Sequence, residues 1–399
     1  MHFDLPRPVL RALSMLEEGG FSAFVVGGCV RDFVLGIPPH DYDICTAASP
    51  DEMKEIFRGE RTIETGLKHG TLTVLMEGEP LEITTFRLDG DYLDGRHPSS
   101  VIFTRKIEED LSRRDFTVNA MAYSPREGIC DPFGGREDCK KGIIRCVGEP
   151  ERRFNEDALR ILRALRFSAR LRFPIADETA TAIHALKENL SRISRERIAV
   201  ELNGLLMGQS EKVMDAFWDV LLAVLPQLSG ADERTKKKSI AMLCAAPREL
   251  PLLWAAFLGC CHGESEKCAG LAREALLSLK MPVKLMEDVS RLLTWREAVP
   301  EIENLQELLM HMGPDGLSGL LRLYHGEKPG LQERLQQLLD ENACYSLRQL
   351  QVNGKDMAAL GLKGPRIGEM LNGLLLQVVR GELENEKAAL LKRAAELEG

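Results

Sequence analysis

The sequence predicts an α+β fold: a head built on a mixed β-sheet with flanking helices, followed by an elongated all-α neck, body and tail. Two observations predict it. Short strand-like runs separated by turns occur in the first part of the chain, at 23–26, 43–45, 71–76, 81–86 and 101–103. After residue 149 these runs stop, and apolar residues recur at helical spacing as far as the C-terminus. Strands in one part and helices in the other are typical of α+β proteins rather than of alternating βαβ units.

The length of 399 residues exceeds what one hydrophobic core normally holds together. Turn-forming stretches at 147–150 and 208–210 are candidate joints. We therefore expect four parts: a head at 1–145, a neck at 146–207, a body at 208–325 and a tail at 326–399.

Composition narrows the classes of protein that fit. The formal net charge of −9 gives no overall sign of nucleic-acid binding, so basic segments have to be sought locally. The chain has no apolar run long enough for a membrane span, and its start lacks the plan of a signal peptide. Ten cysteines without paired spacing indicate reduced thiols. We expect a cytoplasmic protein without a membrane partner.

The segment from Phe24 to Ile44 carries the strongest chemical signal. An apolar run ends in Gly27-Gly28, a helix-compatible stretch with Arg31 follows, and then comes the pair Asp41-x-Asp43. If the pair is extended, both carboxylates point to one face of the strand. Two carboxylates in one site need a neutralising cation, and oxygen ligands suit Mg²⁺. Glycines before a helix allow close approach of an anion. The combination indicates a phosphoryl- or nucleotidyl-transfer site.

Neither of two common nucleotide-binding motifs is present. Gly27-Gly28 does not form a G-x-G-x-x-G fingerprint, and the chain contains no P-loop sequence.

The segment 153–172 predicts one amphipathic helix. Its apolar side contains Ala158, Ile161, Leu162, Leu165 and Ala169, and its polar side is rich in arginine. Arginine suits bidentate recognition of phosphates and base edges better than lysine does. We therefore expect this helix to have a binding role.

Four motifs in order resemble the class II nucleotidyltransferase superfamily of tRNA CCA-adding enzymes and bacterial poly(A) polymerases. They are the Gly27–Asp43 segment, 109–122 (EDLSRRDFTVNAMA), 156–167 (EDALRILRALRF) and 194–198 (SRERI). Together they cover roughly the first 205 residues. The stretch 362–368 (LKGPRIG) resembles the tail of bacterial CCA-adding enzymes more loosely.

The resemblance implies roles for individual residues. Mg²⁺ would bind Asp41 and Asp43, with Glu82 as a third carboxylate at the catalytic centre. The nucleotide would contact Gly27, Gly28, Arg31, Arg114, Asp115, Asn119, Asp157, Arg160, Arg163 and Arg166. A tRNA would be held by the helical half, where the candidate phosphate contacts are Lys355, Lys363, Arg366 and Arg380. CTP and ATP would be the other substrates, and DNA is not expected as a partner.

Base choice follows from the chemistry of Asp157 and Arg160, which are i, i+3 neighbours in the predicted helix. A carboxylate only accepts hydrogen bonds and a guanidinium only donates them. Cytosine and adenine each present an amino donor beside a ring acceptor and match the pair. Uracil and guanine present the reverse pattern, which costs about 1–3 kcal/mol per unsatisfied buried group. We expect CTP and ATP to be accepted and UTP and GTP to be rejected.

Four functions remain open at this point. The segment 87–98 resembles the flexible loop that A addition requires in this family, so CC addition alone is disfavoured. The stretch 65–71 departs from the basic-aromatic signature of poly(A) polymerases. CCA addition is therefore the expected activity. The alternatives are, in order, A addition alone, poly(A) synthesis and a non-catalytic RNA-binding protein.

Overall fold

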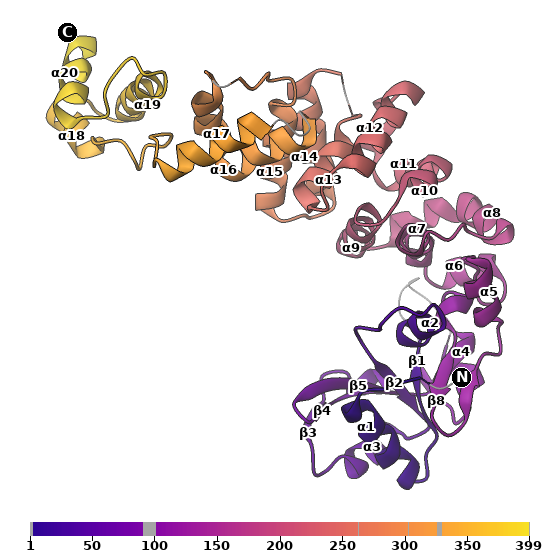
Figure 1. Cartoon of the computed structure of the whole chain (residues 1–399). Helices are drawn as coiled ribbons and strands as arrows, with labels where there is room; N and C mark the ends of the chain where they lie inside the picture. The colour runs from indigo at the N-terminus through magenta and orange to yellow at the C-terminus, as the bar shows by residue number, and fades with distance from the viewer. Residues whose placement is uncertain (1–2, 91–100, 262, 302, 325–328, 399) are drawn as a thin grey trace. The chain divides into compact units, whose positions relative to one another are not determined.

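A computed structural model describes the chain except for residues 1–2, 91–100, 262, 302, 325–328 and 399 (Figure 1). The described chain forms two compact units, Met1–Pro226 and Gln227–Gly399. The four-part division predicted from the sequence is finer than this, and its boundaries stay predictions. Strands lie in the first unit and the second is helical, so the predicted α+β fold is confirmed.

The first unit begins with a mixed sheet. Its described strands lie in the order β3-β4-β5-β2-β1-β8-β9. Their bounds are β1 Ala23–Val26, β2 Asp43–Thr46, β3 Arg61–Ile63, β4 Thr71–Met76, β5 Glu79–Thr85, β8 Ala122–Ser124 and β9 Gly128–Cys130. Among the strand pairs that the structure describes in this sheet, only β2–β5 is parallel. This pairing matters for the site because β2 and β5 carry two of the predicted carboxylates.

Five helices of the first unit surround this sheet and its loops: α1 Arg7–Glu18, α2 Gly28–Val34, α3 Pro50–Ile56, α4 Ile107–Ser112 and α5 Gly135–Lys141. Helices α1 and α3 lie together against β4 (Figure 1). A second sheet pairs β6 (Arg87–Asp89) with β7 (Val101–Phe103). Most of the loop predicted at 87–98 lies outside the described residues.

Strand prediction succeeded for five short strand-like segments. The strands at 23–26, 43–45, 71–76 and 81–86 are present with small shifts at their ends. The predicted strand at 101–103 also forms, but it belongs to the second sheet. Strands β3, β6, β8 and β9, each three residues long, were not predicted, because a run this short rarely shows an alternating pattern.

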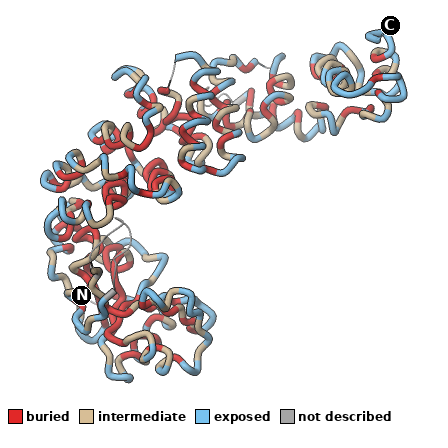
Figure 2. Tube along the Cα trace, turned by 180° about the vertical axis from the view of Figure 1, so that it is seen from behind, coloured by how far each residue is buried: buried red, intermediate tan, exposed pale blue. Residues whose placement is uncertain are grey.

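The predicted single helix over 153–172 is wrong in one respect: it is two helices. Helix α6 (Pro150–Glu156) ends at Asp157, whose φ of −143° and ψ of 103° are extended, and α7 (Leu159–Leu171) follows. The Asp157 carboxylate accepts a hydrogen bond from the main-chain N–H of Leu159 at 3.0 Å. Aspartate competes in this way with helical hydrogen bonding and favours helix starts. The apolar side was placed correctly, since all five of its residues are buried. Figure 2 shows that buried and exposed residues alternate along the described chain.

The rest of the first unit is α8 Asp177–Leu186, α9 Arg195–Leu206, α10 Glu211–Ala216 and α11 Trp218–Val224. The second unit contains α12 Glu233–Ala245, α13 Leu250–Leu258, α14 Ser265–Ser278, α15 Val283–Thr294, α16 Leu305–Tyr324, α17 Pro329–Asp340, α18 Gly354–Ala359, α19 Pro365–Val379 and α20 Lys387–Glu398. Helix α16 is kinked at Gly313, which has a φ of 71° and precedes Pro314. Met357, Leu374 and Leu390 lie in a core shared by α18, α19 and α20. Over the described residues, no helix is long and apolar enough to cross a membrane.

Candidate active site

Three carboxylates meet at the sheet. In the parallel β2–β5 ladder Ile44 pairs with Ile83, which places Asp43 beside Glu82. Asp41 lies two residues before Asp43, outside strand β2. These three side chains border one cleft of about 790 Å³, which we call the carboxylate cleft. The structure therefore brings together the residues predicted to bind metal and the predicted third carboxylate.

Electrostatics make the carboxylate cleft a suitable place for a cation. Burial raises the pKa of Asp43, Arg114 opposes that effect, and the negative charges of Glu82 and Asp41 raise the pKa further. A nearby cation would relieve this excess of negative charge. Among the described residues, no group of three or more His, Cys, Asp or Glu side chains is arranged to hold a metal alone. Carboxylate oxygens are donors that suit Mg²⁺.

Gly27 allows an arginine to approach the start of α2. Its φ of 74° lies in the left-handed region that favours glycine. A Cβ atom at this position would lie 3.0 Å from Nη1 of Arg114. A larger residue would therefore strain the backbone and push Arg114 away from the turn.

Arg31 is buried and firmly held. Its guanidinium donates to Asp32 at 2.7 and 2.9 Å and to Oδ1 of Asn119 at 2.7 Å. It also lies 5.7 Å from the centre of the Phe167 ring. These contacts join α2 to the segment around Asn119 and to α7.

A pocket of about 430 Å³ adjoins these groups, and we call it the arginine pocket. Nine of the ten predicted nucleotide ligands border it: Gly27, Gly28, Arg31, Arg114, Asp115, Asn119, Asp157, Arg160 and Arg163. Asp43 borders both this pocket and the carboxylate cleft. The cationic and anionic parts of the predicted site are therefore next to each other.

Asp115 lies at the wall of the arginine pocket and is 8% exposed. Its carboxylate accepts hydrogen bonds from Nε of Arg163 at 2.8 Å and from the main-chain N–H of Phe116 at 2.8 Å. Burial alone would raise its pKa, but Arg163 and Arg160 outweigh that effect, and the pKa is lowered. Asp115 therefore remains an ionised hydrogen-bond acceptor at neutral pH.

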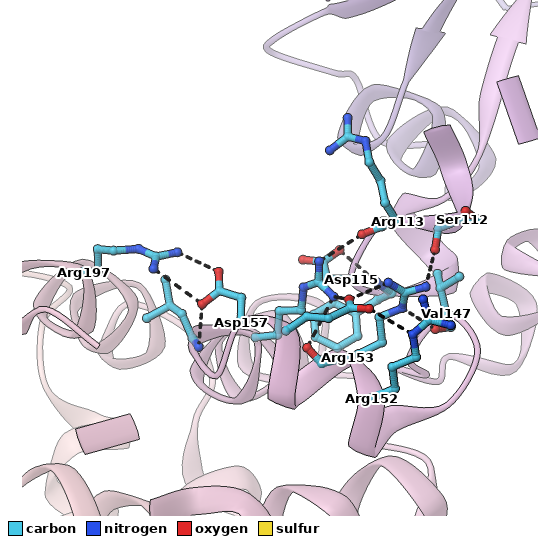
Figure 3. A network of polar contacts seen from close by, with 12 residues as sticks. Ser112, Arg113, Asp115, Val147, Arg152, Arg153, Asp157 and Arg197 are labelled. Carbon is cyan, nitrogen blue, oxygen red and sulfur yellow. Dashed lines mark hydrogen bonds and ion pairs between the residues drawn. The ribbon is translucent and has the colours of Figure 1, made fainter. Parts of the chain in front are cut away.

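Asp157 and Arg160 border the arginine pocket, but each is held by a different partner. Asp157 forms an ion pair with Arg197 at 2.8 Å (Figure 3). Arg160 pairs with Glu156 at 2.9 Å and donates to the main-chain oxygen of Arg113 at 3.0 Å. The sequence predicted that both residues lie on one helix. In the structure Asp157 precedes α7 and Arg160 lies in its first turn.

Arg166 is placed differently from the other predicted ligands. It is not part of the pocket wall, and its Nε lies 2.7 Å from Glu201 on α9. Its guanidinium also lies over the ring of Phe167 at 4.7 Å, and burial lowers its pKa. A Cβ atom on Gly204 would lie only 2.4 Å from its Cδ. Arg166 thus contributes to the packing of α7 against α9.

Five residues that border the arginine pocket were not among the predicted site residues: Arg113, Leu159, Phe167, Arg170 and Arg197. Arg170 was visible on the polar side of the predicted helix. Arg197 lies in the motif at 194–198, so its presence was noted but not its pairing with Asp157. Phe167 ends the motif at 156–167, but it was given no role, because an aromatic residue on a helix usually packs in a core.

The predicted RNA contacts lie in the second compact unit. Lys355 and Lys363 are exposed. Arg366 pairs with Glu398 at 3.0 Å, and Arg380 pairs with Glu307 at 2.9 Å. The two arginines are exposed as well, and each has a carboxylate partner.

Comparison with known proteins identifies the family. The Poly A polymerase head domain matches residues 23–145, a probable RNA and SrmB-binding site of polymerase A matches 172–229, and a putative tRNA nucleotidyltransferase domain 2 matches 248–394. The CCA-adding enzyme of Geobacillus stearothermophilus is 38% identical, over 95% of this chain and 94% of that protein. The one from Leuconostoc mesenteroides is 36% identical, over 98% of both.

Solved structures agree with this match. The crystal structure of the Bacillus stearothermophilus CCA-adding enzyme in complex with CTP aligns with a TM-score of 0.83 and 34% identity. The alignment covers 99% of this chain and 98% of that one. The predicted resemblance is therefore confirmed, and the chain belongs to the CCA-adding enzymes, a family of nucleotidyltransferases.

Proposed function

We propose that this enzyme adds C, C and A to the 3′ end of tRNA with Mg²⁺ bound by Asp41 and Asp43, and that Glu82 is a third carboxylate of the same centre. One observation carries the proposal: Asp43 borders both the carboxylate cleft and the arginine pocket. A metal held there would be within the reach of a triphosphate in the pocket. A solved structure of a similar enzyme is a complex with CTP, which supports a nucleotide as a substrate.

The divalent cation would activate the attacking 3′-oxygen and neutralise the leaving pyrophosphate. The protein side chains position the substrates and stabilise the charge that develops during transfer. Arg31 and Arg114 present guanidinium groups to the triphosphate. Asp115, kept ionised by Arg163, offers an acceptor to a ribose hydroxyl.

Base selection belongs to Asp157 and Arg160. Asp157 offers only acceptors and Arg160 only donors to the Watson–Crick edge of the incoming base. Each residue is held by an ion pair, and each also borders the pocket, where it can form further hydrogen bonds to a base. Cytosine and adenine complement this pattern and uracil and guanine oppose it.

The second unit supplies contacts to the body of the tRNA, with Lys355 and Lys363 as phosphate ligands. Helix α19 starts next to Lys363, after Gly364 with a φ of 59° and with Pro365 in its first turn. Free N–H groups at such a start complement a phosphate. We place the reaction in the cytoplasm, which agrees with the ten free cysteines.

The test uses purified protein, Mg²⁺ and three tRNA transcripts that end before CCA, after C and after CC. Each receives CTP, ATP or both, and product lengths are read at single-nucleotide resolution. Completion of all three to CCA, without further growth, is the expected result. Extension of the CC-ended transcript alone would mean A addition, and long A-tails would mean poly(A) synthesis.

Asp41→Ala tests the metal assignment in the same assay. Loss of a metal ligand should abolish incorporation and leave tRNA binding nearly unchanged, as measured by filter binding. The control is Asp51→Ala, which removes an exposed carboxylate from the first turn of α3. Extension of RNA by the Asp41→Ala protein would exclude Asp41 as an essential ligand.

A further inference from the structure

Arg153 connects the helix before the base-selecting residues to the segment that carries the triphosphate and ribose ligands. Its side chain is 11% exposed. Nη2 donates to the main-chain oxygen of Ser112 at 2.6 Å, and Nε donates to that of Val147 at 3.0 Å. Nη1 pairs with Glu156 at 2.6 Å. One guanidinium therefore uses all three of its nitrogens on partners from three parts of the chain (Figure 3).

The oxygens of Ser112 and Arg113 stand at the C-terminal end of α4. Carbonyl groups at a helix end have no partner inside the helix, and they carry the negative end of its dipole. Arg153 binds the first of these oxygens and Arg160 binds the second at 3.0 Å. Figure 3 shows the Arg113 side chain pointing away from this network, so the contact is made by its backbone alone. Two adjacent carbonyls thus receive two guanidinium groups from the α6–α7 segment.

The same two arginines are linked a second time. Both pair with Oε2 of Glu156, at 2.6 Å for Arg153 and 2.9 Å for Arg160. Nη1 of Arg160 also lies 3.4 Å from the main-chain oxygen of Arg153. A shift of Arg153 would therefore move both the carboxylate and the carbonyl that orient Arg160.

We propose that Arg153 is a positioning residue for base selection: it fixes the distance between Arg160 and the Arg113–Asp115 segment, so that base reading is aligned with the bound triphosphate. The proposal rests on the proposed roles of Arg160 and of the arginine pocket. Arg153 itself is not among the residues that border the pocket, and it acts through Arg160 and the end of α4.

The test compares Arg153→Lys with a neighbouring control, Arg152→Lys. A lysine at 153 keeps the charge but cannot reach three partners with a planar fork. Arg152 pairs with the same carboxylate, at 3.1 Å from Oε1 of Glu156, but its side chain is 73% exposed and it makes none of the contacts to Ser112 and Val147. The full-length variants are given CTP or UTP on the transcript ending before CCA, and ATP or GTP on the transcript ending in CC.

The quantity measured is the ratio of kcat/KM for CTP to that for UTP, with the ATP-to-GTP ratio beside it. A fraction of inactive or unfolded enzyme lowers both rates equally and cancels in the ratio, so a merely structural role leaves the ratio unchanged. All assays run below the melting temperature of the least stable variant. We expect Arg153→Lys to lower both ratios about tenfold, as the loss of a buried hydrogen bond to a charged group would, while Arg152→Lys keeps the wild-type ratios.

Unchanged ratios in Arg153→Lys would overturn the proposal, as would an equal loss of rate with all four nucleotides. If the wild-type enzyme itself gave CTP-to-UTP and ATP-to-GTP ratios near one, it would not select bases, and the proposed function of Arg160 would be contradicted instead. The two failures are therefore distinguishable in one set of measurements.

Discussion

At the scale of single residues, the site depends on how charge is compensated. Asp115 and Asp157 each have an arginine partner, Arg163 and Arg197 respectively. Asp43 has only the more distant influence of Arg114 against burial and two like charges, and its pKa is raised. We propose different tasks for these three carboxylates: Asp115 and Asp157 would orient a nucleotide, and Asp43 would bind a cation.

Replacing Glu82 with Gln should lower the pKa of Asp43. The negative charge of Glu82 disfavours the Asp43 anion, so its removal favours ionisation and moves the titration to lower pH. The measurement is ¹³C NMR of aspartate-labelled, metal-free protein, with Asp43 assigned from the spectrum of Asp43→Asn. Glu79→Gln, at the exposed start of the same strand, is the control. A shift to higher pH would contradict the arrangement of the carboxylate cleft.

Asp157→Ala should relax discrimination against UTP more than it weakens triphosphate binding. It removes the acceptor that opposes the uracil edge, an effect of about tenfold or more in the CTP-to-UTP ratio of kcat/KM. KM for CTP should change less than that ratio. Asp177→Ala removes an exposed carboxylate from the first turn of α8 and should leave the ratio unchanged. An unchanged ratio in Asp157→Ala would remove this residue from base reading.

At the scale of elements, the arginine pocket depends on close contact between α7 and α9. Gly204 lets the aliphatic part of Arg166 cross α9, where a Cβ atom would come within 2.4 Å. Gly208 similarly leaves room for Ala169, 2.8 Å from a Cβ atom built there. Because α9 is held this close to α7, Arg197 at its start can reach Asp157.

Gly204→Ala should therefore destabilise the protein by about 1–3 kcal/mol through overpacking. The matched control is Gly270→Ala in α14, where no atom lies within 4 Å of the new Cβ and the φ angle is ordinary. Alanine there should stabilise the helix by about 0.5–1 kcal/mol. Thermal unfolding followed by circular dichroism should show Tm shifts of opposite sign. Shifts of the same sign and size would mean that the contact at Gly204 is not close.

At the scale of the whole molecule, the candidate active site and the predicted RNA contacts lie in different compact units. Every residue that borders the carboxylate cleft or the arginine pocket precedes Pro226, and all four predicted phosphate contacts follow it. Nucleotide selection and tRNA binding should therefore respond to different mutations.

The double variant Lys355→Ala/Lys363→Ala should weaken tRNA binding and reduce its dependence on salt. Loss of two phosphate contacts should lower the slope of log K against log salt by roughly 1.5. CTP affinity should not change. The control is Lys237→Ala/Lys267→Ala, two exposed lysines of the same unit that pair with Glu233 and Glu264. Filter binding between low and moderate salt gives the slopes, and equal slopes in both variants would exclude the two predicted contacts.

Sequence reasoning predicted much of the fold and named most of the residues that border the arginine pocket, because those signals are local. Short strand-like runs predicted the strands around the carboxylates, and the spacing Gly27-Gly28 to Asp43 predicted their chemistry. Three-residue strands such as β8 were missed, because their stability comes from neighbours on both sides of the sheet. The break between α6 and α7 was missed because a helical apolar pattern continues across it.

The sequence by itself thus determined the α+β order, the family and the residue types of the site. Only the tertiary structure decided which residues lie together. The β2–β5 register places Asp43 beside Glu82, and Asp157 forms an ion pair with Arg197, forty residues away in the sequence. The tertiary structure also separated Arg166 from the pocket wall and joined Arg153 to the end of α4. The physical reason is that motifs record which chemical groups are present, whereas ion pairs and carbonyl contacts depend on distances that long-range packing alone sets.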